Sequence, residues 1–194
     1  MVASLDRRAQ GGAGAVRRAA SAAPDPGDAI ADVARALGDR PLAFVTLFIP
    51  AHHDRAAIAR AVRRHMPRGV PVIGATTAGE IGPHGYQDDS VVGLGFPAEH
   101  FACRTRLLAP LSDYALDTGA GIAAALAAPR PGEDAEAMPH SFVLMLVDGL
   151  SRREDALVAS LAPALGPVPL VGGSSGDGLD FGATFVLHEG RFHQ

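Results

Sequence analysis

The chain has 194 residues, of which 47% are hydrophobic and 20% charged, so it can bury the core of a globular protein. Its formal net charge of −4 gives no basic surface for nucleic acid. Cys103 is the single cysteine, which excludes a disulfide framework and suits a reducing compartment. The chain contains no lysine, which excludes P-loop and Schiff-base chemistry.

Two stretches of the sequence indicate where in the cell the protein is expected. The purely apolar runs, such as residues 142–147, are far shorter than a membrane span, so we expect a cytoplasmic protein that does not enter a membrane. Residues 1–27 carry four arginines among alanine, glycine and serine, which is typical of a disordered arm or of a translation start assigned too early. An organelle transit peptide is the alternative. The folded domain is expected over residues 28–194.

The first half of this domain reads as two helices and three strands. Asp28 is expected to cap a helix over residues 29–37, which Gly38 ends. Asp54 is expected to cap a second helix that runs to about residue 66. Strands are predicted at residues 42–49, 70–73 and 90–96. A loop of small residues is expected over 74–85.

The second half gives a similar set of elements. Alternation over residues 101–107 predicts a half-exposed antiparallel strand, and a helix is expected over 111–128 before a polar linker at 129–139. A capping box at Ser151 and Glu154 predicts a helix through residue 165. The remaining predictions are strands at residues 142–147 and 169–171, a second glycine-rich loop, and a hairpin turn at Glu189-Gly190.

An internal repeat relates the two halves at an offset of 98 residues. Residues 70–78 fall on residues 168–176 with an identical or similar residue at each position, and the preceding strand and helix also correspond. The sequence therefore predicts an α/β fold with a duplicated strand–helix–strand unit around a mixed, largely parallel sheet. Ligands of such folds bind beyond the carboxyl ends of the strands, so we expect the two small-residue loops to converge on one cleft.

The loops are expected to offer backbone N–H groups and hydroxyls to a polar small molecule or an anion. The alternative is that their glycines only supply tight turns. The candidate ligand-binding residues are Gly74, Thr76, Thr77, Gly79, Glu80, Gly172, Gly173, Ser174, Ser175 and Asp177.

Two other chemistries have local patterns. Gly172 to Gly176 matches the G-x-S-x-G elbow of serine hydrolases, but the residues after Ser174 favour no helix, and the matching loop carries threonines. No catalytic residue is assigned. His188 and His193 are candidate haem ligands, although a structural histidine is the commoner case. The adjacent His52 and His53 diverge, so we interpret them as helix-entry residues rather than metal ligands.

Together these motifs resemble a known family. The run from Val72 to Ile81, followed by Asp89-Ser90-Val91-Val92, resembles the G-x-S/T-T-A-G-E-I signature of FIST sensory domains. Residues 148–150 and 169–177 resemble the second signature of the family, and residues 185–191 its following strand and turn. The resemblance covers about residues 28–194.

The resemblance implies a non-catalytic input domain for signal transduction, bacterial in this case, that binds a small ligand such as an amino acid. It implies a signalling partner such as a histidine kinase, a diguanylate cyclase or a chemotaxis protein. A subset of the family binds haem and senses nitric oxide, and residues 172–192 look closest to that subset, which gives the alternative function. Family members usually continue into a second half, so a fragment is expected here.

Overall fold

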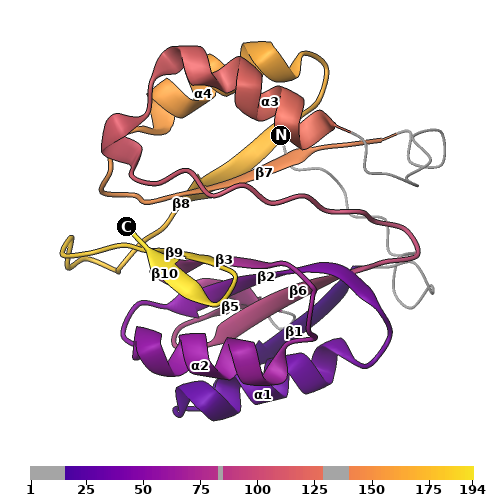
Figure 1. The fold of residues 1–194 in the computed structure, drawn as a ribbon. Helices are drawn as coiled ribbons and strands as arrows, with labels where there is room; N and C mark the ends of the chain where they lie inside the picture. The colour runs from indigo at the N-terminus through magenta and orange to yellow at the C-terminus, as the bar shows by residue number, and fades with distance from the viewer. Residues whose placement is uncertain (1–15, 83–84, 129–139) are drawn as a thin grey trace.

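In the computed structural model, residues 16–82, 85–128 and 140–194 are described. The main sheet has six strands in the order β1-β6-β2-β3-β9-β10, and α1 and α2 cover one of its faces (Figure 1). A separate pair, β7-β8, lies on the other side of the main sheet, beneath α3 and α4 (Figure 1). The fold is thus mixed α/β, as the sequence predicts.

The main sheet is assembled from both ends of the chain. Its strands are β1 (Arg17–Ser21), β2 (Leu42–Pro50), β3 (Val72–Thr77), β6 (Val91–Pro97), β9 (Val186–His188) and β10 (Arg191–His193). Only β2 and β3 pair in parallel; the other neighbours in this described sheet are antiparallel. The main sheet contains fewer parallel pairs than expected, because the strands on either side of the β2-β3 pair, β6 and β9, run antiparallel to their neighbours.

Four helices, a two-stranded parallel sheet and a short hairpin make up the rest of the described structure. The helices are α1 (Pro26–Leu37), α2 (Arg55–His65), α3 (Gly119–Ala127) and α4 (Glu154–Leu165), with one-turn 3₁₀ segments at Leu111–Asp113 and Leu116–Thr118. The small sheet pairs β7 (Val143–Val147) with β8 (Leu170–Ser174) in parallel, and β4 (Glu80–Gly82) forms a hairpin with β5 (Gly85–Gln87). In the described ranges, no helix has both the length and the apolarity that a membrane span requires.

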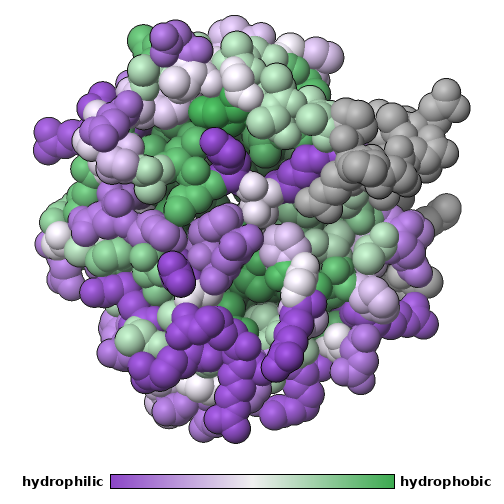
Figure 2. All heavy atoms as spheres, viewed as in Figure 1, coloured by the Kyte–Doolittle hydropathy of each residue, from purple (hydrophilic) through white to green (hydrophobic). Residues whose placement is uncertain are grey.

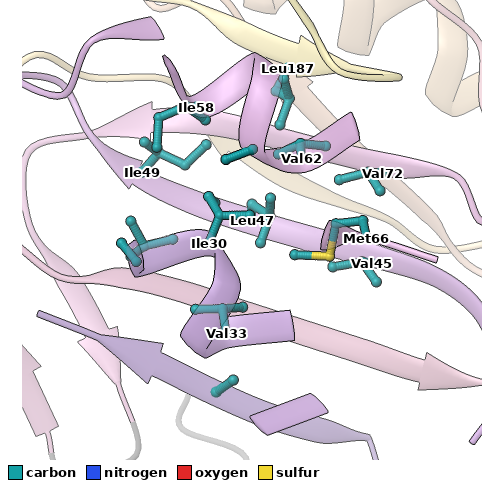
Figure 3. Close-up of a cluster of buried hydrophobic side chains, with 14 of the residues drawn as sticks. Ile30, Val33, Val45, Leu47, Ile49, Ile58, Val62, Met66, Val72 and Leu187 are labelled. Atoms are coloured by element: carbon teal, nitrogen blue, oxygen red, sulfur yellow. The ribbon is translucent and has the colours of Figure 1, made fainter. Parts of the chain in front are cut away.

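The core lies between the main sheet and the first two helices. Ile30 and Val33 of α1 and Ile58 and Val62 of α2 contact inward-facing residues of β2 (Figure 3). Within the described residues this cluster contains sixteen buried side chains, among them Leu187 of β9. Burial of this amphipathic set explains why α1 and α2 form despite their arginines, which stay at the surface.

Within each of the two strand–helix–strand units the two strands pair in parallel, and the register of that pairing is the same in both units. Val45 lies opposite Val72 in the first unit, and 98 residues later Val143 lies opposite Leu170. The cores beside the two units differ in size. Within the described residues, the core beside the second unit contains three buried residues, Val147, Leu157 and Leu161, whereas the core beside the first contains sixteen. That the units arose by duplication stays a prediction.

Several predicted boundaries are wrong, each for a local reason. Asp25, not Asp28, caps α1, since its carboxylate accepts from the main chain of Gly27 at 2.7 Å and of Asp28 at 3.0 Å. Residues of the expected arm form β1, because β6 offers that strand an open edge. The first loop is shorter than expected, since β3 extends to Thr77 and the β4-β5 hairpin follows.

Several predictions for the second half of the chain are also wrong. Residues 101–107 form no strand, since no described strand edge pairs with them. The long helix predicted at 111–128 divides into 3₁₀ turns and α3, and β8 reaches Ser174 through the predicted loop. Ser151 does not cap α4, because its hydroxyl donates to the Asp148 carbonyl at 2.6 Å. The linker at 129–139 lies outside the described residues, whereas the Glu189-Gly190 hairpin turn is confirmed.

Candidate functional site

A cleft of about 420 Å³ opens at the carboxyl ends of β2 and β3. Residues after both of these strands line one side of it, and the segment after β8 lines the other. The lining residues are Pro50, Ala51, His52, Thr77, Ala78, Gly79, Glu80, Asp88, Asp89, Asp177, Gly178, Asp180, Gly182 and Ala183. The loops that follow β3 and β8 therefore meet at one cleft, which we call the acidic cleft.

A direct main-chain contact holds these two loops together. The N–H of Gly176 donates to the carbonyl of Thr76 at 2.8 Å. A Cβ at position 176 would lie 3.4 Å from the Ala78 nitrogen, which is ordinary van der Waals contact, so the hydrogen bond rather than the absence of a side chain joins the two loops here.

Buried hydroxyls strengthen the same junction. Thr184 donates to the Asp148 carboxylate, and the Thr76 hydroxyl accepts from the Phe185 N–H at 3.0 Å. The Ser175 hydroxyl accepts from the Gly149 N–H at 3.2 Å. Since buried hydroxyls need such partners, Thr76 and Ser175 serve the framework in this structure.

Glu80 is the most buried acid of the cleft, with 2% of its surface exposed. Its carboxylate accepts from the Thr77 hydroxyl at 2.5 Å and from the Ser90 N–H at 3.3 Å. Burial raises the pKa of Glu80, and these two hydrogen bonds oppose that rise. Glu80 therefore fixes the hairpin to the strand that follows it.

Four more carboxylates face this cleft, from Asp88, Asp89, Asp177 and Asp180. Asp177 is held in place because it accepts from the main chain of Gly182 at 2.7 Å and of Ala183 at 3.0 Å. Among the described lining residues, His52 alone has a side chain that can be cationic, and its Nδ1 lies 3.4 Å from Asp89. The cleft therefore favours a cation over the anion that the loops alone suggested.

The ten predicted ligand-binding residues separate into three groups. Thr77, Gly79, Glu80 and Asp177 line the acidic cleft. Gly172, Gly173 and Ser174 line a second cavity, between α4 and β8. Gly74, Thr76 and Ser175 line neither cavity, and a Cβ at Gly74 would lie 2.5 Å from the Leu47 carbonyl, so that glycine allows close strand packing.

The hydrolase pattern at Ser174 lacks its structural context. The hydroxyl of Ser174 donates to Glu154 at 2.8 Å, and no helix follows β8 directly in the described chain, whereas an elbow requires one. The serine therefore sits in a strand that ends in an extended loop.

The two candidate haem ligands lie on the β9-β10 hairpin. Burial lowers the pKa of His193, and the Nε2 of His188 lies 3.2 Å from the Thr105 hydroxyl. Neither histidine lines the acidic cleft or the α4–β8 cavity, so these two cavities do not fit a haem bound at His188 or His193. Among the described residues, no group of three or more His, Cys, Asp or Glu side chains could hold a metal ion.

Of the five acids that line the cleft, three were not predicted from the sequence, Asp88, Asp89 and Asp180, and neither was His52. His52 follows the carboxyl end of β2 directly, and Asp88 and Asp89 follow the β4-β5 hairpin. The signal that could have found His52 was its place at the end of a buried strand, where α/β folds bind ligands. Asp180 had no such signal, since its position depends on how the loop after β8 folds back.

Comparisons with known proteins give one match. The model of the FIST N domain matches residues 43–194, which is most of the chain and starts at β2. No curated protein and no solved structure matches.

Proposed function

The chain belongs to the FIST N domain family, a sensory family of signal transduction, and on that premise we propose that its acidic cleft binds a small organic cation. The observation that carries the proposal is the meeting of five carboxylates in one cleft built by both loops. A volume of about 420 Å³ lies within the usual range of small-molecule sites. An amino acid or an amine, held by its ammonium group, fits this lining.

The cleft supports binding rather than catalysis. Its carboxylates are largely engaged with neighbours on the protein: Asp177 with the loop main chain, Asp88 with the Tyr86 hydroxyl at 2.8 Å, and Glu80 with Thr77. Such preorganised acceptors stabilise a bound ammonium group at low cost in ordering. Asp180 is exposed on the second loop, at the lining of the cleft, where a bound ligand would meet it.

Binding would act on a signalling partner by selecting one arrangement of the two loops. A ligand that contacts both Glu80 and Asp177 stabilises the state in which the loops are together, and so shifts the population toward it. A kinase or cyclase that contacts this face would read that shift, in keeping with the family resemblance.

The experiment is a calorimetric screen of the full chain with amino acids, amines and carboxylic acids matched in size. We expect heat of binding from compounds with an ammonium group and none from the acids. Asp180→Asn should weaken binding about threefold to tenfold, because it removes one charge at a partly solvated site. Asp117→Asn, an exposed acid outside the cleft, is the matched control. Binding of the acids alone would refute the proposal.

Nitric oxide sensing through haem is the second hypothesis, and it rests on the family resemblance alone. The test is the absorption spectrum of the protein titrated with haemin. A Soret band that His188→Ala or His193→Ala abolishes would support it, and the absence of a band in the wild type would end it.

A further inference from the structure

Two adjacent histidines form a pair of neighbouring rings at one wall of the acidic cleft. His52 lines the cleft, and the centroid of its ring lies 4.6 Å from the centroid of the His53 ring. The expectation that these side chains diverge is therefore wrong. The reason is a tight turn after β2, in which the His53 N–H donates to the Pro50 carbonyl at 3.2 Å.

The two rings differ in their contact with solvent. His53 is 6% exposed, and its buried Nε2 has no hydrogen-bond partner among the described residues. Burial lowers the pKa of His53, and the neighbouring His52 lowers it further. A proton on this ring is therefore disfavoured, and His53 is uncharged at neutral pH.

His52, by contrast, is exposed and faces an acid. Its Nδ1 lies 3.4 Å from a carboxylate oxygen of Asp89, which precedes β6 in the chain. Proton uptake by His52 would turn this contact into an ion pair and leave Asp89 less available to a ligand. The protonated ring would also offset the charge of one of the five carboxylates of the cleft.

The other charged groups around the pair have partners of their own or belong to the cleft itself. Asp25 and Asp54 accept from main-chain N–H groups as the caps of α1 and α2. The guanidinium of Arg55 lies over the ring of Phe185, 4.0 Å from its centroid. Besides Asp89, the carboxylates that line the cleft are those of Glu80, Asp88, Asp177 and Asp180.

The arginines do not supply a second cation to this lining. Hydrophilic residues, drawn purple, gather in the lower part of Figure 2, where α1 and α2 lie, and α2 carries exposed arginines at Arg60, Arg63 and Arg64. No arginine is among the described residues that line the cleft. Imidazole groups ordinarily titrate at about pH 6.5. His52 is therefore the lining residue whose proton changes the charge of the cleft near neutral pH.

A bound ammonium group and a proton on His52 oppose each other. Both are positive, and both compete for the Asp89 carboxylate, so the neutral form of His52 binds a cation more tightly. Binding then releases a proton, and the affinity falls as the pH falls. If the cation weakens proton uptake about tenfold, the affinity at pH 5.5 is about fivefold lower than at pH 7.5.

We propose that protonation of His52 regulates the acidic cleft, which holds an amine at neutral pH and releases it on acidification. The inference rests on the proposed function, since it concerns the same ligand at the same site. The histidine pair and Asp89 all belong to the first half of the chain, on the segments that follow β2 and β5. Because burial disfavours a proton on His53, the response comes from His52.

The test is calorimetry of the full chain with butylamine and 1,4-diaminobutane, whose ammonium groups stay protonated up to about pH 8. We expect the affinity to be about threefold to tenfold lower at pH 5.5 than at pH 7.5. At pH 6.5 the heat of binding should also vary with the ionisation enthalpy of the buffer, because the buffer takes up the released proton.

Variants of the chain assign the proton. His52→Gln should remove both effects, because the amide does not titrate. His100→Gln is the matched control, since His100 is exposed and lies 3.0 Å from its own acid, Glu99, outside the cleft. Glu80→Gln and His53→Phe should both retain the pH effect. Circular dichroism at both pH values checks that each variant is folded.

Three results would overturn the inference. The first is an affinity at pH 5.5 that equals or exceeds the affinity at pH 7.5, which would leave the proposed function standing. The second is a pH effect that His52→Gln retains and that Glu80→Gln or His53→Phe removes. The third is no binding of either amine at pH 7.5; if the amino acids of the screen also fail to bind, the proposed function falls with it.

Discussion

In the first strand–helix–strand unit, β3 has a strand on each side and two helices cover the sheet; in the second, β8 has β7 on one side and no strand of the described chain on the other. Both units nevertheless pair in one register, 98 residues apart. The local pattern of a unit is thus enough to set its strand pairing. How deeply the unit is buried depends on the segments that other parts of the chain bring to it.

The largest expected effect compares the two cores. Leu47→Ala, at a fully buried site of β2, should lower the free energy of unfolding by about 3–5 kcal/mol. Leu161→Ala in α4 should cost about 2 kcal/mol, since a smaller and more open core can collapse around the change. Urea denaturation of both variants measures the difference. Equal losses would mean that the second unit is as well packed as the first.

A smaller effect is expected at the junction of the units. Thr184→Val keeps the shape of the side chain but removes its hydrogen bond to the buried Asp148, at a cost of about 1–3 kcal/mol. Hydrogen exchange should accelerate in β7 and β8 and stay unchanged in β2. Uniform acceleration through both units would show instead that they unfold together.

The smallest effect concerns Glu80, where the loops meet. Because its folded pKa is raised above the ordinary value of 4.5, the folded state holds the proton more tightly than the unfolded chain. Its contribution to stability is full below pH 4.5 and is lost as the pH rises through the folded pKa. Glu80→Gln should flatten the fall in melting temperature over that pH range, since the amide oxygen can accept from the Ser90 N–H while the amide NH₂ donates to the Thr77 hydroxyl. An unchanged pH profile would assign the dependence to another group.

The sequence predicted the parts of the fold that local residues decide. α2 was predicted because Asp54 is a favoured N-cap residue and an apolar stripe follows it, and in the structure Asp54 accepts from the Ala57 N–H at 2.5 Å. The alternating run at 101–107 failed, since a strand needs an edge to pair with, and the sequence does not show where edges are free. Gly74 was predicted as a ligand-binding residue, although it lines neither cavity and serves close packing against Leu47.

The candidate site was predicted in outline and changed in its chemistry. The repeat at offset 98 indicated that two loops would meet, and the loops do line one cleft. Its charge depends on Asp88, Asp89 and Asp180, which lie outside the repeated glycine motif. The sequence could not place these acids because their positions depend on a hairpin and on a loop that folds back over the junction.

The hydrogen bond from Gly176 to Thr76 joins the two halves of the chain directly beside the acidic cleft. Each partner is followed in the sequence by a residue that lines the cleft, Asp177 after Gly176 and Thr77 after Thr76. The cleft therefore exists only while the two loops are in contact. A ligand that binds there stabilises the association of the two units together with its own site, because it binds the joined state and not the separated one.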